Sequence, residues 1–195
     1  MIILSDDPAP KNYGRCLLSV TNTTGSIRFE ILKAWLVNPT IQSTDVKGEI
    51  KTVVDAYKKS FKKTIKKHNP DGYIAERFMP RGNTVQGGET VSMMLGLNLD
   101  ALSINHKIKL TPAVSWKTQI KRYFDLKQLY KDIRPCPDHL LDAVLIGLYL
   151  AYFEFNVKPY SHMTEEDIKY IVKKLKRIGV VLRIIQKIKS KSKIK

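Results

Sequence analysis

Cysteine and long apolar runs are scarce in this sequence, and each shortage excludes a class of protein. The 195 residues include two cysteines, Cys16 and Cys136, which lack the CxxC spacing of a zinc site, and we interpret both as reduced, buried, small hydrophobic side chains. No apolar run approaches the ~20 residues that a membrane-spanning helix needs. The N-terminus has no basic start and reaches Asp6 and Asp7 too early for a signal peptide. We therefore expect a cytoplasmic protein with no membrane partner.

Acidic residues are scarce as well. The chain has 18 Asp and Glu against 34 Lys and Arg, so its net charge is +16. A surface with this charge attracts a polyanion, and we expect nucleic acid, ahead of an anionic membrane, as the partner. The hydrophobic content of 43% is typical of a globular chain, and the length suffices for one sizeable core.

Hydrophobic periodicity predicts an α/β protein. Short apolar runs bounded by turn residues predict strands at residues 2–6, 14–21, 26–36, 73–78 and 107–111. Helical spacing predicts helices at residues 45–68, 88–102, 116–129 and 138–155, and a basic helical tail at residues 164–195 with Gly179 as a candidate break. Three antiparallel strands followed by alternating helices and strands indicate a mixed five-stranded sheet flanked by helices. We divide the chain into a domain at residues 1–158 and a basic helical C-terminal extension at residues 159–195.

The few carboxylates fall where a metal site can form. Asp7 ends the first predicted strand and Glu76 lies on the fourth. Asp138 and Asp142 lie one turn apart on the apolar helix, and His139 shares their side of it. Carboxylates at the ends of adjacent strands, facing a helix that carries more of them, form an oxygen-rich pocket that Mg²⁺ or Mn²⁺ prefers. Two such ions about 4 Å apart activate water and stabilise the leaving oxygen in phosphodiester cleavage.

Each of these carboxylates also has a purely structural interpretation. Asp7 can be a turn residue, Glu76 can pair with a neighbouring arginine, and Asp138 after a proline can cap the helix. Asp142 is harder to explain in this way, because it lies among apolar residues where an unpaired charge is costly.

Three segments resemble the motifs of RuvC-type and poxvirus-type Holliday-junction resolvases. Residues 3–14 resemble their first strand and loop, and residues 75–83 resemble their second acidic motif. Residues 138–143 resemble their closing Asp-x-x-Asp-Ala motif, so the resemblance spans about residues 1–155. It implies an RNase H-like fold, a homodimer, Mg²⁺, and paired nicks across a four-way junction. It also suggests a virus or phage as the source, with the host-cell cytoplasm or nucleoid as the location.

Two positions depart from the family pattern. Asp6 stands where the family has an apolar residue, on the strand face opposite Asp7, and the sequence offers no explanation for it. Aligning Asp142 with the last family aspartate places His139, rather than Asp138, three residues earlier. Either residue can complete the metal set, and His139 can also act as a general base.

Basic and aromatic residues near these motifs are candidates for DNA binding. Six lysines crowd residues 58–67, where like charges repel unless an anion is nearby, and we select Lys62 and Lys63 from them. The resemblance places a lysine near the scissile phosphate after the fifth strand, which suggests Lys117 and Lys121. The loop after Glu76 contributes Arg77, Phe78, Arg81 and Asn83, of which Phe78 either wedges into the junction or belongs to the core.

The sequence thus predicts a structure-selective, Mg²⁺-dependent endonuclease that resolves four-way junctions as a homodimer, with two ions per site. One alternative is an RNase H-like nuclease that acts on flaps, forks or single strands. Another is a non-catalytic DNA-binding protein. The helix with Val91, Met94, Leu95 and Leu102 is a candidate dimer interface whose other interpretation is core packing.

Overall fold

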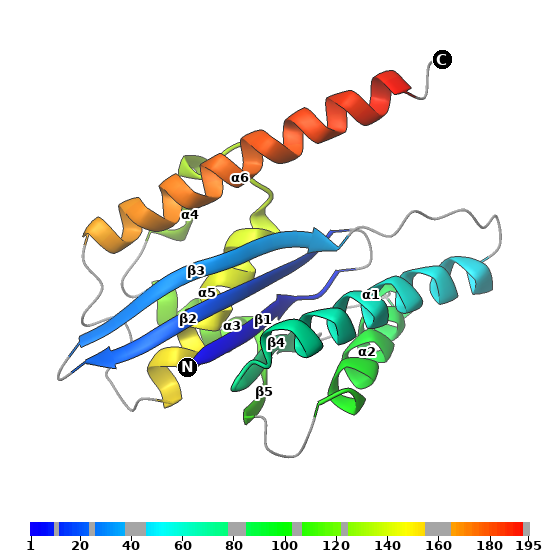
Figure 1. Cartoon of the computed structure of the whole chain (residues 1–195), viewed down its shortest axis with the longest axis horizontal. Helices are drawn as coiled ribbons and strands as arrows, with labels where there is room; N and C mark the ends of the chain where they lie inside the picture. The colour runs from blue at the N-terminus through cyan, green and yellow to red at the C-terminus, as the bar shows by residue number, and fades with distance from the viewer. Residues whose placement is uncertain are drawn as a thin grey trace.

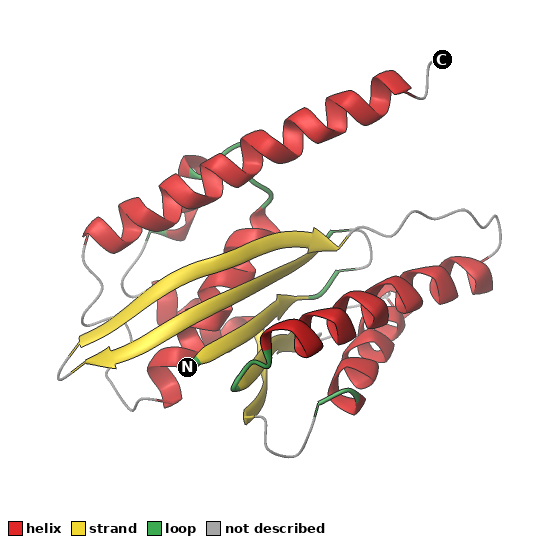
Figure 2. Cartoon of the chain, viewed as in Figure 1, coloured by secondary structure: helices red, strands yellow, loops and turns green. Residues whose placement is uncertain are grey.

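The computed structural model describes residues 1–9, 12–23, 26–37, 46–77, 85–102, 107–121, 125–154 and 165–192. Within them, five strands form one mixed sheet in the order β3-β2-β1-β4-β5 (Figures 1 and 2). The strands are β1 (Ile2–Asp7), β2 (Tyr13–Thr23), β3 (Ser26–Val37), β4 (Gly72–Arg77) and β5 (Lys107–Pro112). The helices are α1 (Val46–His68), α2 (Val85–Asp100), α3 (Ala113–Lys121), α4 (Leu126–Asp132), α5 (Asp138–Glu154) and α6 (Glu165–Ser192). The predicted α/β fold with a mixed five-stranded sheet is confirmed.

The sheet separates two cores, and β1 contributes to both. Alternation along β1 sends Ile3 into the core under α5, while Leu4 enters the core that α1 and α2 cover. Figure 1 shows α1 and α2 on one side of the sheet and α5 on the other. Successive residues at the end of β1 therefore face different layers of the molecule.

Strand directions decide which side chains meet at the end of β1. β1 pairs antiparallel with β2, and Asp7 lies opposite Gly14. It pairs parallel with β4, and Asp6 lies opposite Ala75. Parallel strands end at the same edge of a sheet, so Asp7 and Glu76 come from neighbouring strand ends.

The structure corrects the predicted helix at residues 116–129. Two helices, α3 and α4, occupy this region, and residues 122–124 between them lie outside the described part. Asp125 is the N-cap of α4, and its Oδ1 accepts a hydrogen bond from the Gln128 backbone N–H at 3.1 Å. An aspartate in this position starts a new helix, which explains why one long helix was the wrong prediction.

Gly179 does not break the basic tail, because α6 continues through it. A Cβ atom at Gly179 would lie 2.5 Å from the Cys136 backbone nitrogen, so glycine allows α6 to approach the α4–α5 connection closely. Ile171 and Leu175 of α6 are buried in the α5 core, and the Tyr170 hydroxyl accepts from the Ile31 N–H at 3.1 Å. The beginning of the tail is therefore packed on the body.

The candidate dimer face on α2 is core instead. Val91, Met94 and Leu95 are buried between α2, α1 and the sheet, so these side chains cannot also contact a partner. No helix in the described part of the chain is long and apolar enough to cross a membrane.

Candidate metal centre

Asp7, Glu76 and Asp142 meet in the layer between the sheet and α5. Asp7 ends β1, Glu76 is near the end of β4, and Asp142 lies in the second turn of α5. Asp7 and Asp142 are 5% and 7% exposed, and Glu76 is half-buried. The sequence separates these residues widely, but the strand ends and the helix bring them together.

The beginning of α5 lies directly on β2, and this places His139 beside Asp7. Gly14 makes the approach possible, because a Cβ atom there would collide with the backbone carbonyl of His139. Asp7 pairs with Gly14 across the strands, and the His139 Nδ1 lies 2.6 Å from the Asp7 Oδ2. The hydrogen bond to Asp7 raises the pKa of His139, and the charges of Asp7 and Asp142 raise it further.

Asp142 has two partners from other helices. The Tyr130 hydroxyl of α4 donates to its Oδ1 at 2.5 Å, and the Lys117 Nζ of α3 donates to its Oδ2 at 3.0 Å. Burial and the nearby charge of Asp7 nevertheless raise the pKa of Asp142, although Lys117 opposes this shift. The donors from Tyr130 and Lys117 therefore only partly offset the cost of burying this carboxylate beside Asp7.

Glu76 has one strong partner, the indole of Trp116, whose Nε1 donates to its Oε2 at 2.9 Å. Burial raises the pKa of Glu76, and the charge of Asp7 is the next largest cause, with Asp142 adding to it. Neighbouring negative charges therefore help to raise the pKa values of Glu76 and Asp142, and a bound cation would relieve this effect.

Among the described residues, no three His, Cys, Asp or Glu side chains converge closely enough to hold an ion in this conformation. Lys117 and Tyr130 hold Asp142, and His139 holds Asp7. The donor chemistry still fits a hard divalent cation, because the cluster combines three carboxylates, two of them with raised pKa values, and one imidazole. Asp7, Glu76 and Asp142 could hold such an ion.

Asp138 and His139, the two candidates to complete the set, have different positions. His139 contacts Asp7 directly. Asp138 lies at the rim, with its side chain 48% exposed and its Oδ1 3.7 Å from the Arg134 Nη2. The geometry favours His139, and a role for Asp138 as a ligand stays a prediction.

The predicted DNA-binding residues do not form one group. Lys117 belongs to the centre through Asp142. Arg77, Lys62, Lys63 and Lys121 are exposed, with Arg77 at the end of β4. Phe78, Arg81 and Asn83 lie outside the described residues.

Trp116 and Tyr130 are the centre residues that sequence reasoning missed. Trp116 directly precedes Lys117, which we selected from the sequence, and this adjacency is the signal that could have identified Trp116. No signal pointed to Tyr130, because the start of α4 was not recognised.

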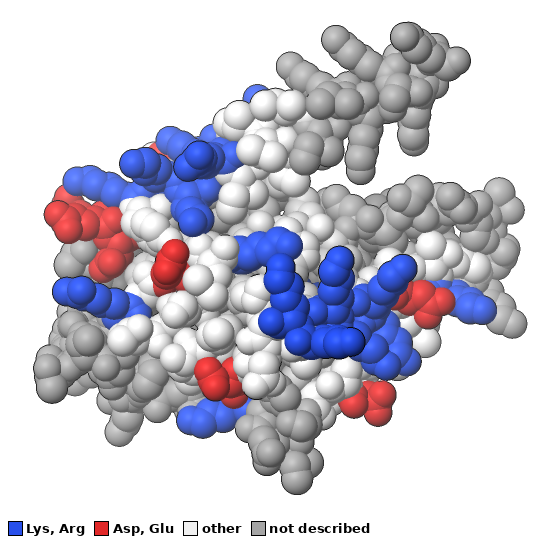
Figure 3. Space-filling model, viewed as in Figure 1, with Lys and Arg blue, Asp and Glu red and all other residues white. Residues whose placement is uncertain are grey.

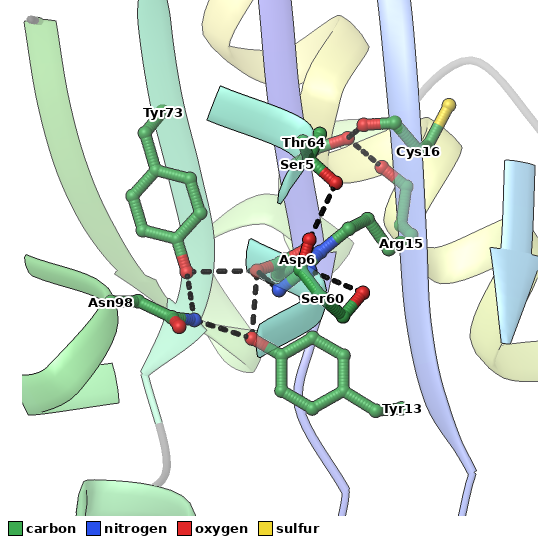
Figure 4. Close-up of polar contacts among 10 residues, drawn as sticks. Ser5, Asp6, Tyr13, Arg15, Cys16, Ser60, Thr64, Tyr73 and Asn98 are labelled. Carbon is green, nitrogen blue, oxygen red and sulfur yellow. Dashed lines mark hydrogen bonds and ion pairs between the residues drawn. The ribbon is translucent and has the colours of Figure 1, made fainter. Parts of the chain in front are cut away.

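Asp6, the unexplained carboxylate, is fully buried on the opposite face of β1 (Figure 4). Its Oδ1 accepts from the Arg15 Nε at 2.7 Å, and its Oδ2 accepts from Arg15 Nη2 at 2.9 Å. The hydroxyls of Tyr13 and Tyr73 also donate to Oδ2, at 2.7 and 3.0 Å. The Asn98 side-chain amide completes the network by donating to the Tyr13 hydroxyl at 3.0 Å. Asp6 is therefore the acceptor at the centre of a buried polar network.

No family model matches the sequence, and no curated protein matches it. Solved structures do match. The Thermus thermophilus RuvC structure has a TM-score of 0.60 and 16% identity, over 79% of this chain and 95% of that one. T. thermophilus RuvC in complex with a Holliday junction substrate has a TM-score of 0.63 and 18% identity, over 80% of this chain and 96% of that one. The yeast mitochondrial Holliday junction resolvase Ydc2 has a TM-score of 0.51 and 15% identity, over 90% of this chain and 85% of that one. At these identities the likeness concerns the fold, and the chain has the RNase H-like fold of these proteins.

Proposed function

We propose that this protein is a metal-dependent endonuclease that resolves four-way DNA junctions. The observation that carries the proposal is the cluster of Asp7, Glu76 and Asp142, formed by two parallel strand ends and a facing helix. The raised pKa values of Glu76 and Asp142 fit a cation site, and the fold is that of proteins described as junction resolvases. This chain covers 95% and 96% of the two T. thermophilus RuvC chains, so the proposal concerns a whole nuclease domain.

Asp7, Glu76 and Asp142 would hold Mg²⁺, with Mn²⁺ as a substitute and two ions in each site. Bound there, the ions would supply a nucleophilic water and charge stabilisation for phosphodiester hydrolysis. His139 orients Asp7 through the contact at Nδ1 and is placed to exchange a proton at its other ring nitrogen. Trp116 fixes the Glu76 carboxylate, and Lys117 brings a positive charge next to Asp142, where a phosphate could contact it.

The proposed partners are branched DNA and a second copy of the chain. The net charge of +16 suits a polyanion, and a two-fold dimer matches the two equivalent strands of a four-way junction. We further propose that residues 1–158 form the nuclease domain and that the basic extension at residues 159–195 adds phosphate contacts. We place the protein in the cytoplasm, or in the host-cell cytoplasm or nucleoid if the source is viral.

A non-catalytic DNA-binding protein is the second candidate. Lys117 and Tyr130 already satisfy Asp142, and His139 already satisfies Asp7. Two of the three carboxylates therefore have donors from the chain itself, as they would in a protein that binds DNA without a metal.

The experiment is cleavage of labelled four-way, three-way, flap and linear DNA in Mg²⁺, in Mn²⁺ and in EDTA. We expect paired nicks in the four-way junction, with either ion and not in EDTA. Equal cutting of all branched forms would support a flap or fork nuclease instead. Binding without cleavage under every condition would support the non-catalytic protein.

A further inference from the structure

A second feature lies away from the proposed centre, between the end of β3 and α1. It is a groove of about 570 Å³. The described residues that line it are Lys33, Trp35, Leu36, Val37, Ala56, Lys59, Ser60, Lys63, Thr64, Lys67 and His68. These residues include no carboxylate, although four of them are lysines.

The lysines form an ordered row rather than a diffuse surface charge. Lys59, Lys63 and Lys67 follow one another at every fourth residue of α1, so they lie on one side of the helix at a rise of about 6 Å. Lys33 of β3 completes the row from the other wall. Figure 3 shows Lys and Arg gathered in one cluster over this part of the molecule.

The lysines of this row are close to one another, and the nearest acid along α1 is Asp55, one turn before Lys59. Among the described residues, no carboxylate forms an ion pair with Lys59, Lys63 or Lys67. Like charges four residues apart on a helix destabilise it. His68, at the end of the row, has its pKa lowered by its partial burial and by the charges of Lys67 and Lys33. The groove therefore has a positive potential that an anion would stabilise.

The groove and the proposed centre lie on opposite faces of the sheet. Trp35 and Val37 belong to the core that α1 covers, whereas Asp142 belongs to α5 on the other face. Leu36 pairs with Gly14, which pairs with Asp7, so the groove lies at the same end of the sheet as Asp7. Two strand spacings, about 10 Å, separate Leu36 from Asp7 across the sheet. A single phosphate cannot contact both sites, but neighbouring segments of one branched molecule can.

We propose that this groove binds the sugar–phosphate backbone of a nucleic-acid segment other than the one placed at the metal centre. A row of lysines spaced along a groove suits a chain of evenly spaced phosphates better than a compact anion. Binding of nucleic acid in the groove does not depend on the proposed function. The statement that the groove holds a different segment from the one at the metal centre does rest on it.

Trp35 makes the proposal testable, because it lines the groove with the Lys33 ammonium 4.7 Å from its ring centre. The other tryptophan, Trp116, is fully buried. Binding of a thymidine oligonucleotide or of a short duplex should change the Trp35 fluorescence. The titrations are run in EDTA, so that they report binding whether or not the protein cleaves DNA.

The decisive variants are Lys63→Gln/Lys67→Gln on α1 and the matched control Lys127→Gln/Lys131→Gln on α4. Both pairs are exposed, are spaced four residues apart on a helix, and change the charge equally, but only the first pair lines the groove. We expect the groove variant to flatten the log–log salt dependence of binding by about 0.7 per lost contact on a single strand and about 0.9 on a duplex. The control should change it far less.

The two DNA forms show whether the groove prefers a single strand or a duplex. A flatter salt dependence in the groove variant but not in the control, with either form, supports the proposal. Equal losses in both variants, or no loss in either, would overturn it. Polyglutamate that bound as tightly as DNA, with the same dependence on Lys63 and Lys67, would also overturn it, because the groove would then recognise any polyanion. Loss of cleavage in Mg²⁺ with intact groove binding would count against the proposed function alone.

Discussion

Asp6 and Asp7 are neighbours in the chain, yet the two faces of β1 give their carboxylates opposite surroundings. Asp6 is fully buried and accepts hydrogen bonds from Arg15, Tyr13 and Tyr73. Asp7 lies at the edge of the other core, where His139 is its direct partner and where its charge raises the pKa of Glu76. The charge of Asp6 is thus compensated by its donors, whereas Asp7 belongs to a group of negative charges that repel one another.

The difference shows what each cluster contributes. A buried charge with several donors fixes the position of its strand, and removing a single partner leaves another charge buried. A group of carboxylates that disfavour one another lowers stability and is kept where function needs it. We therefore expect substitutions at the two faces to separate stability from activity.

The largest expected effect is on cleavage. Glu76→Gln should reduce cleavage of a four-way junction about a thousandfold, because a metal site supplies several kcal/mol of transition-state stabilisation. Its free energy of unfolding in EDTA should be unchanged or higher, since a neutral side chain no longer repels Asp7. Asp55→Asn, an exposed acid on α1, is the matched control. Near wild-type cleavage would remove Glu76 from the centre.

On the other face, Asp6→Asn should reverse this pattern. Arg15 would stay buried without its counter-charge, so we expect the free energy of unfolding to fall by about 3–5 kcal/mol in urea titrations. Cleavage per folded molecule should change little. Arg15→Met should cost a similar amount, and the double variant should cost less than the sum of the two. A loss below about 1 kcal/mol would mean that water reaches this network.

The contrast between the two faces was partly predictable. Strand alternation placed Asp6 and Asp7 on opposite faces, and the order of strands and helices predicted that Asp7, Glu76 and Asp142 would approach one another. These results depend on local periodicity and on the rule that parallel strands end together.

The partners of Asp6 were not predictable in the same way. Arg15 and Tyr73 come from neighbouring strands, and Asn98 comes from α2, so the network exists only once β2, β4 and α2 have come together with β1. Tyr130 escaped prediction for a different reason. Asp125 begins a new helix, which turns Tyr130 towards Asp142, and helical periodicity alone does not show such a break.

The pH dependence of stability in EDTA should report on the face of β1 that carries Asp7. The pKa values of Glu76 and Asp142 are raised in the folded protein, so the folded state keeps protons that the unfolded chain has released. The free energy of unfolding should therefore fall as pH rises from the ordinary carboxyl value of about 4 through the raised values. His139 acts in the same direction, because its stabilisation is complete below about pH 6.5 and is lost as pH passes its raised pKa.

Urea midpoints at several pH values between the ordinary carboxyl range and alkaline conditions measure this decline. The Glu76→Gln and His139→Gln variants should each flatten the curve. MgCl₂ should raise the midpoint of the wild type at neutral pH, since a ligand that binds the folded state stabilises it, and should not raise that of Glu76→Gln. A pH profile that all three proteins share would show that these groups are not the source of the decline.

The smallest expected effect comes from one substitution made on both faces, the change of a tyrosine to phenylalanine. Tyr73→Phe removes a donor from the buried Asp6 and should lower the free energy of unfolding by about 1.5–3 kcal/mol, the usual range for a hydrogen bond to a charge. Tyr130→Phe removes a donor from Asp142, but Lys117 remains and Tyr130 is half-buried, so we expect less than about 1 kcal/mol. Only Tyr130→Phe should alter cleavage, by at most about tenfold, because it frees one carboxylate oxygen beside the proposed ions. Equal losses of stability, measured by urea titration in EDTA, would mean that the centre is packed as completely as the network.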